Sequence, residues 1–353
     1  MSTGTRLSDD TTAHDATPTT TRNWWRDEAQ EPIRRNLGLV VVLLALFVIG
    51  AITRPDLYRD ADWVTGNMFT ILKLASAIGV ITVGMTFVII GGGIDLSVGA
   101  IVALAGVWCT TVQTQSYGAG GMIFTALAVG TVVGLINGVL ISYGRLVPFI
   151  ATLAMLVAAR GLAAQISDKQ TQVSSNLDIN SIATDRILGV PVLVIILGLV
   201  VAAGWVLLNR TTFGRRTVAV GGNPEAARLA GINVRLHTLR LYALSGLCCG
   251  IAAIMLTSQA TSAQAAMANL YELDAIAAAI IGGTLLSGGR GTIIGALFGV
   301  VVFSTITNLF AINGLTTEDQ NMVKGGIIVA AVLVQQFRLK SVTQFLSRTR
   351  ANT

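Results

Sequence analysis

Charged residues are scarce in this chain of 353 residues: Asp, Glu, Lys and Arg make up 12% of it, whereas 53% of the residues are apolar. Soluble domains contain about 25% charged residues. The shortage therefore excludes an ordinary soluble protein and indicates an all-α protein that crosses a membrane several times. The formal net charge of +6 does not predict a nucleic acid partner, because Lys and Arg lie between apolar runs and form no extended basic face.

Histidine and cysteine are also rare. His14 and His237 lie in different polar regions, which excludes a histidine-based metal site or catalytic triad within the membrane. Cys109, Cys248 and Cys249 fall inside apolar segments, so we expect buried thiols and no disulfide framework. With no credible base beside any serine either, the chain is predicted to hold no cofactor, metal or catalytic residue.

Three regions follow from the composition along the chain. Residues 1–33 are rich in Thr, Asp and Ser and carry no apolar pattern, so we predict a disordered cytoplasmic tail. Residues 34–340 form the predicted membrane domain, and 341–353 a second cytoplasmic tail. No signal peptide precedes the first apolar run, so this run should be an uncleaved span that begins inside the cell.

The apolar runs predict about ten transmembrane helices at 1.5 Å per residue, or eight to nine if the short ones are re-entrant. Lys and Arg gather on one side, which places both termini and residues 209–240 in the cytoplasm and residues 168–186 outside. The predicted spans are 37–53, 67–90, 95–112, 120–143, 146–167, 187–208, 241–260, 273–288, 291–312 and 321–337.

The basic segment 209–240 contains a very short predicted helix with both of its ends encoded. Asn223 suits the N-cap, Pro224 the first helical position and Gly231 the position just past the C-terminus, so residues 224–230 should be helical. Two turns are not stable alone in water. This helix must therefore lie against the helix bundle, the lipid surface or another subunit.

A broken helix is predicted in the sequence GMTFVIIGGGIDLSVG. Three consecutive glycines, Gly91, Gly92 and Gly93, each cost about 1 kcal/mol inside a helix. Asp95 and Ser97 would then cap a helix that restarts at Asp95. The break could be purely structural, or it could expose polar backbone to a translocation path, and the two roles are compatible.

Glycines four residues apart indicate an internal repeat. The fourth span contains Gly130, Gly134 and Gly138, and the ninth contains Gly291, Gly295 and Gly299, so each span has a face for close helix packing. Asp95 and Asp274 open the third and eighth spans in the same order. Spans two to five would thus correspond to spans seven to ten with opposite orientation, an arrangement common in transporters.

Other polar residues of the spans allow two interpretations. Asn137 could face a path or form an interhelical hydrogen bond, and Glu272 and Asp274 could face an outer vestibule or simply favour a helix N-terminus. The cations Lys73, Arg160 and Lys324 lie toward the outer span ends, where we expect them to snorkel.

Four motifs in order closely resemble the permease subunits of ribose-type monosaccharide ABC importers, over about residues 37–337. They are GMTFVIIGGGIDLSVGAIVALAG, GGNPEAARLAGI, YELDAIAAAIIGGTLLSGGRGTIIGALFG and NMVKGGIIVAAVLVQ. The resemblance implies a type II importer fold of ten helices and a permease homodimer in the bacterial inner membrane. It also implies an extracytoplasmic sugar-binding protein and a cytoplasmic ATP-binding subunit that holds ATP and Mg.

The resemblance further places the family's coupling loop on residues 222–232, so that the short helix would be seated in the ATP-binding subunit. The residues it assigns to this role are Asn223, Pro224, Glu225, Arg228, Leu229 and Gly231. The sequence agrees on one point, because it contains no GxxxxGK[ST] loop with which to cradle ATP phosphates.

Two other functions stay open at this level. One is an ABC permease for another small solute, such as a branched-chain amino acid or a nucleoside. The other is an ion-coupled secondary transporter, which would normally place paired acids deep in the membrane, where only Asp95 approaches such a position.

Overall fold

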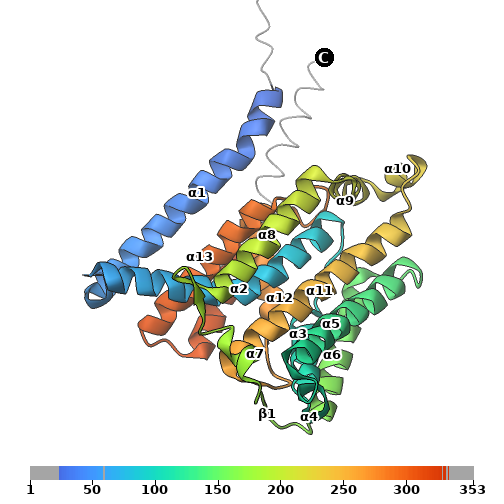
Figure 1. The fold of residues 1–353 in the computed structure, drawn as a ribbon. Helices are drawn as coiled ribbons and strands as arrows, with labels where there is room; N and C mark the ends of the chain where they lie inside the picture. The colour runs from blue at the N-terminus through green and yellow to red at the C-terminus, as the bar shows by residue number, and fades with distance from the viewer. Residues whose placement is uncertain (1–23, 59, 328, 331–332, 334–353) are drawn as a thin grey trace, which may run out of the picture.

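The computed structural model describes residues 24–58, 60–327, 329–330 and 333 (Figure 1). Helices build most of this part of the chain, and its short strands pair antiparallel as β1 with β4 and β2 with β3. The predicted all-α membrane fold is therefore confirmed. The elements are α1 Trp24–Thr53, η1 Pro55–Leu57, α2 Ala61–Ile90, α3 Val98–Cys109, α4 Val112–Gln115, α5 Gly118–Ser142, α6 Pro148–Ile166, β1 Gln172–Val173, α7 Leu177–Ser181, β2 Arg186–Ile187, β3 Val190–Pro191, α8 Val192–Arg210, α9 Thr212–Gly222, α10 Pro224–Leu229, α11 Val234–Ala260, β4 Ser262–Ala263, α12 Tyr271–Ile281 and α13 Ile293–Ile312.

Within the described residues, 7 helices are long and apolar enough to cross a membrane: α1, α2, α5, α6, α8, α11 and α13. The third and eighth predicted spans are much shorter than expected. They appear as α3, with 12 residues, and α12, with 11 residues. At 1.5 Å per residue neither crosses a bilayer of about 30 Å, so both agree with the re-entrant alternative. The tenth predicted span is described in part, and residues 317–327 are helical.

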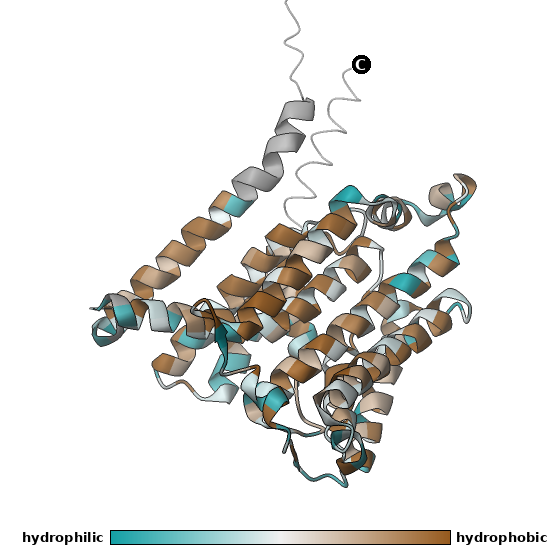
Figure 2. Cartoon of the chain, viewed as in Figure 1, coloured by the Kyte–Doolittle hydropathy of each residue, from teal (hydrophilic) through white to brown (hydrophobic). Residues whose placement is uncertain are grey.

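Helices α2 and α11 form the centre of the bundle, where each contacts the other and α3 contacts α11. In the most apolar window of α2, 89% of the residues are buried, against 11% for α1. Apolar residues run along the long helices, while hydrophilic residues gather in connections at the two ends of the bundle (Figure 2). One end carries α9 and α10, and the opposite end carries α4 and β1 (Figure 1).

Helix packing follows the predicted repeat. Helix α5 packs against α11 and α3, while α13 packs against α2 and α12. Exchanging α2 with α11, α3 with α12 and α5 with α13 turns the first set of contacts into the second. This is the correspondence expected if spans two to four are repeated as spans seven to nine.

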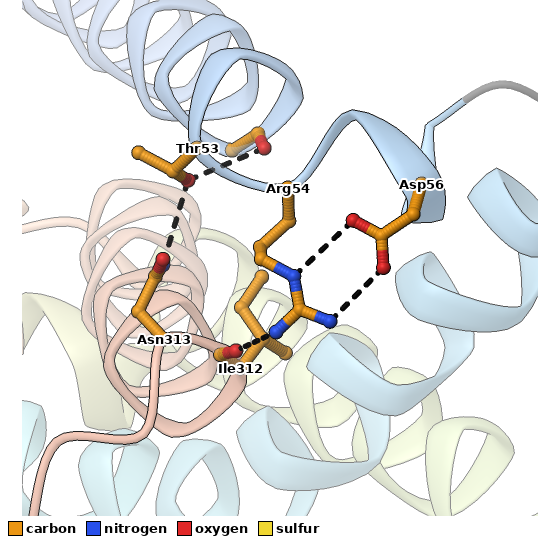
Figure 3. A network of polar contacts seen from close by, with 6 residues as sticks. Thr53, Arg54, Asp56, Ile312 and Asn313 are labelled. Atoms are coloured by element: carbon orange, nitrogen blue, oxygen red, sulfur yellow. Dashed lines mark hydrogen bonds and ion pairs between the residues drawn. The ribbon is translucent and has the colours of Figure 1, made fainter.

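Helix α1 stands at the edge of the bundle and is held where it ends. Arg54 donates a hydrogen bond to the Ile312 carbonyl and forms a 3.0 Å ion pair with Asp56, while Asn313 donates to Thr53 (Figure 3). The helix begins at Trp24, so the last part of the segment predicted as a disordered tail, 1–33, is helical. The other parts of the predicted tails, including 341–353, lie outside the described residues.

Candidate functional site

The short helix α10 has the two ends that the sequence encodes. The Asn223 side chain accepts hydrogen bonds from the backbone N–H groups of Glu225 and Ala226, at 3.1 and 3.0 Å. Gly231 follows with a φ of 81°, a left-handed conformation that favours glycine. The helix covers Pro224–Leu229, one residue less than predicted, because Ala230 already serves as the C-cap. These caps satisfy backbone groups that a helix of this length would otherwise leave unpaired.

Most of α10 faces away from the bundle. Only Ala227 is buried, and the Leu229 side chain is 75% exposed. Glu225 and Arg228 form an exposed ion pair of 2.6 Å, and the Arg228 guanidinium holds the pKa of Glu225 below its usual value. The exposed surface of α10 therefore combines an apolar side chain with a charged pair.

The two helices that flank α10 are joined by a histidine that the sequence analysis did not single out. His237 on α11 is buried, and its Nε2 lies 2.9 Å from the Thr217 hydroxyl on α9. The ring also packs on Phe213, with ring centroids 4.8 Å apart. The sequence offered one sign that this histidine has a structural role: it stands among arginines in a segment that otherwise alternates polar and apolar residues. These contacts hold α9 and α11 together on either side of α10.

The helix break lies where the glycines predict it. Helix α2 ends at Ile90, and Gly92 takes a φ of 85°. The next helix begins at Val98 and not at Asp95, because the Asp95 carboxylate accepts the Ser97 N–H at 3.0 Å and so closes a turn before the helix. Ser97 caps no backbone N–H with its side chain, which corrects the predicted role of this residue.

Asp95 is fully buried at the centre of a hydrogen-bond network. Its carboxylate accepts the Ser97 hydroxyl at 2.6 Å and the Ser245 hydroxyl at 3.1 Å. Asn137 on α5 donates to the Ser97 hydroxyl at 2.8 Å. The network therefore ties the break to α5 and α11, and it brings together three of the residues that the sequence proposed for the path.

A cleft of about 350 Å³ opens beside the break. Gly91, Gly92 and Gly93 line it together with Tyr242 of α11 and with Pro224, the first residue of α10. Asp95 does not line the cleft. The predicted path residues near the break therefore form two groups: the three glycines line the cleft, and the network around Asp95 is buried behind them.

The acids of α12 lie apart from this cleft. Asp274 forms a 2.9 Å ion pair with Lys324, and both side chains are largely buried. Glu272 is also buried, and its Oε2 has no hydrogen-bond partner in the described part of the chain. Arg160 donates to the carbonyls of residues 265, 267 and 268. Arg160 and Lys324 therefore bind protein groups, and the prediction that they snorkel is wrong.

The glycines of α5 lie against the backbone of α11. A methyl group added at Gly134 would collide with the Tyr242 carbonyl oxygen, and one at Gly130 or Gly138 would lie 2.8 Å from Gly250 N or 2.8 Å from Leu239 Cα, closer than side chains tolerate. Such a face lets two helices approach backbone to backbone.

The glycines of the ninth span do not form one helix face. Helix α13 begins at Ile293, because Thr292 caps it, and Gly291 precedes the helix. Gly299 packs against Ala278 of α12, and a methyl group at Gly299 would lie 2.9 Å from the Ala278 carbonyl carbon. Gly295 meets Gly282, the C-cap of α12.

Within the described residues, seven candidate spans, the two short apolar helices α3 and α12 and a capped helix at one end define a polytopic membrane protein. Residues 67–332 match the family described as the permease component of a branched-chain amino acid transport system, and the chain belongs to this permease family. It is thus a permease subunit of an ABC importer and not an enzyme.

Curated relatives align over nearly their whole length. The ribose import permease protein RbsC of Bacillus subtilis is 40% identical over 306 residues, which is 86% of this chain and 94% of the relative. RbsC of Escherichia coli K12 is 38% identical over 299 residues, or 84% and 92% of the two chains. The L-arabinose ABC transporter permease protein AraH of Azospirillum brasilense is 36% identical over 303 residues, or 85% and 87%. No solved structure matches the chain.

Proposed function

We propose that this chain is the permease subunit of an ATP-driven importer that carries a monosaccharide across the bacterial inner membrane. The sugar reaches it from an extracytoplasmic binding protein, and both termini lie in the cytoplasm. The names of its relatives support a sugar: ribose, L-arabinose and galactofuranose. The exposed, doubly capped helix α10 is the observation that carries the proposal, because among the described residues it buries only Ala227 and leaves its other side chains open to a partner.

Helix α10 docks into a cytoplasmic ATP-binding subunit. Leu229 and Ala226 supply a small apolar contact, and Glu225 and Arg228 exchange their mutual ion pair for charges on the partner. ATP and Mg belong to that partner, because this chain has no phosphate-binding loop. A second copy of the permease completes the complex as a homodimer.

The translocation path passes the helix break. Gly91, Gly92 and Gly93 present backbone to the cleft, and a volume of about 350 Å³ accommodates a molecule of monosaccharide size. Asp95, Ser97 and Asn137 hold the break in place from behind. Glu272 and Asp274 belong to the outer part of the path, at the start of α12.

The decisive experiment replaces both Glu225 and Arg228 with Ala. We expect the permease to accumulate in the membrane but to lose co-purification with the ATP-binding subunit, or to hydrolyse ATP without sugar uptake in proteoliposomes. Gly231→Val should do the same, because a β-branched residue is strained at a φ of 81°. Arg235→Ala is the control, since it removes one exposed positive charge from the same segment and leaves α10 intact.

Unchanged assembly and unchanged coupling in both α10 variants would show that α10 is only a polar surface of the membrane domain. The same proteoliposomes identify the solute when they are supplied with ribose, L-arabinose, galactose or leucine. Leucine is included because the family takes its description from branched-chain amino acid transport. Uptake of leucine and of no sugar would overturn the proposed substrate class.

A further inference from the structure

Three segments meet backbone to backbone at the end of α9. Gly221, in the last turn of α9, lies against the Ile90 carbonyl at the end of α2 and against Gly289 in the connection between α12 and α13. The Gly289 N–H donates a hydrogen bond of 2.8 Å to the Ile90 carbonyl. Gly92 and Gly288 complete the contact, because a methyl group at Gly288 would lie 3.0 Å from Gly92 Cα. We call Gly92, Gly221, Gly288 and Gly289 the glycine junction.

Side chains are disfavoured throughout the glycine junction, by collision or by backbone conformation. A methyl group at Gly221 would collide with the Ile90 carbonyl oxygen and lie 2.7 Å from Gly289 N. Gly92, Gly288 and Gly289 have φ values of 85°, 82° and 74°, which side chains disfavour. The next residue in the chain differs: a methyl group at Gly222 meets no atom within 4 Å. Gly222 borders the junction, since a methyl group at Gly289 would lie 2.9 Å from Gly222 Cα, but its own side-chain position is open, so the requirement for glycine does not extend to every residue of this segment.

The glycine junction connects three parts of the candidate site. Gly221 is separated from Pro224, the first residue of α10, by Gly222 and Asn223. Gly92 belongs to the break after α2, and Gly288 and Gly289 belong to the connection between α12 and α13. Gly92, Gly221 and Ser287 also line the cleft beside the break. Any displacement of α10 that moves Gly221 must press directly on both walls of this cleft.

We infer that the glycine junction is the positioning element through which α10 moves the two loops that wall the inner cleft, and so opens or closes that end of the path. Contacts between backbone atoms suit this role because they have no side-chain rotamer that could yield, and packed elements shift between discrete arrangements. The inference rests on the proposed function, since it requires α10 to be moved by an ATP-binding subunit.

The test compares two neighbouring glycines. Gly221→Ala introduces the collision, and Gly222→Ala introduces the same methyl group into open space. In proteoliposomes with the ATP-binding subunit, Gly221→Ala should lower sugar uptake per ATP hydrolysed about tenfold, whereas Gly222→Ala should stay within about twofold of the unmodified permease. Co-purification with the ATP-binding subunit should persist in both, because α10 is unchanged. Normal uptake in Gly221→Ala, or an equal loss in both variants, would overturn the inference.

A cross-link tests the same motion without a collision, in case Gly221→Ala does not fold. Gly222→Cys and Ser287→Cys place thiols on two exposed residues, one at the end of α9 and one in the connection between α12 and α13. A short bifunctional thiol reagent that reduction cleaves then joins them. Cross-linking should abolish uptake, and cleavage should restore it. Full uptake by the cross-linked protein would overturn the inference. Other results would contradict the proposed function itself. They are an unmodified permease without ATP-dependent sugar uptake, or α10 variants that couple ATP hydrolysis to uptake normally.

Discussion

At the scale of the residue, Asp95 shows how one buried carboxylate holds a helix break in place. It accepts hydrogen bonds from the backbone and hydroxyl of Ser97 and from the hydroxyl of Ser245. Asp95→Asn can keep contacts to all three groups, whereas Asp95→Leu removes the acceptor of these three donors, at about 1–3 kcal/mol for each. We expect Asp95→Asn to retain more sugar uptake and a higher unfolding temperature than Asp95→Leu.

Thr82→Val is the matched control for Asp95→Leu. It also replaces a buried polar side chain of this region by an apolar one, but among the described residues the Thr82 hydroxyl bonds only the Ile78 carbonyl of its own helix. Its effect on the unfolding temperature should be small. If Asp95→Leu were as stable and active as the Thr82→Val control, Asp95 would neither hold the break nor shape the path.

At the scale of the element, the close approach of α5 and α11 depends on the absence of side chains at the contact. Gly134→Ala would press a methyl group against the α11 backbone near Gly246, and overpacking of this kind typically costs about 1–3 kcal/mol. We expect the variant to melt at a lower temperature in detergent and to accumulate less in the membrane.

Gly161→Ala serves as the control, because Gly161 also lies in a membrane helix but has open space around it. Alanine is the better helix former by about 0.5–1 kcal/mol, so this variant should melt at the same or a higher temperature. Equal melting of the two variants would show that the contact at Gly134 contributes nothing to stability.

At the scale of the whole molecule, the topology awaits a direct test. Leu177 at one end of the bundle is 81% exposed, and Thr212 at the other end is exposed as well. Single cysteines at these positions should react with an impermeant maleimide in opposite ways: Leu177→Cys in intact cells, and Thr212→Cys only after the membrane is opened. The native thiols Cys109, Cys248 and Cys249 are buried, so their background should be low. Labelling of Thr212→Cys from outside would reverse the predicted orientation.

The sequence by itself determined the features that depend on neighbours along the chain. Apolar length predicts the long helices, Gly91 to Gly93 predict the end of α2, and Asn223 with Gly231 predicts both ends of α10, because helix propensity and capping act within a few residues. The motifs of the sequence, through their resemblance to known permeases, also identified the permease family without the fold.

Only the tertiary structure decided which distant residues meet. Gly221 contacts Ile90 and Gly289, Asp95 bonds Ser245, and Lys324 pairs with Asp274, although each pair is far apart in the sequence. The short lengths of α3 and α12 also depend on packing. An apolar residue can be buried against other segments without belonging to a membrane-spanning helix, so an apolar run alone does not fix the length of a helix. Periodicity and composition carry no information on these contacts, since they describe the polarity of a residue and not its partner.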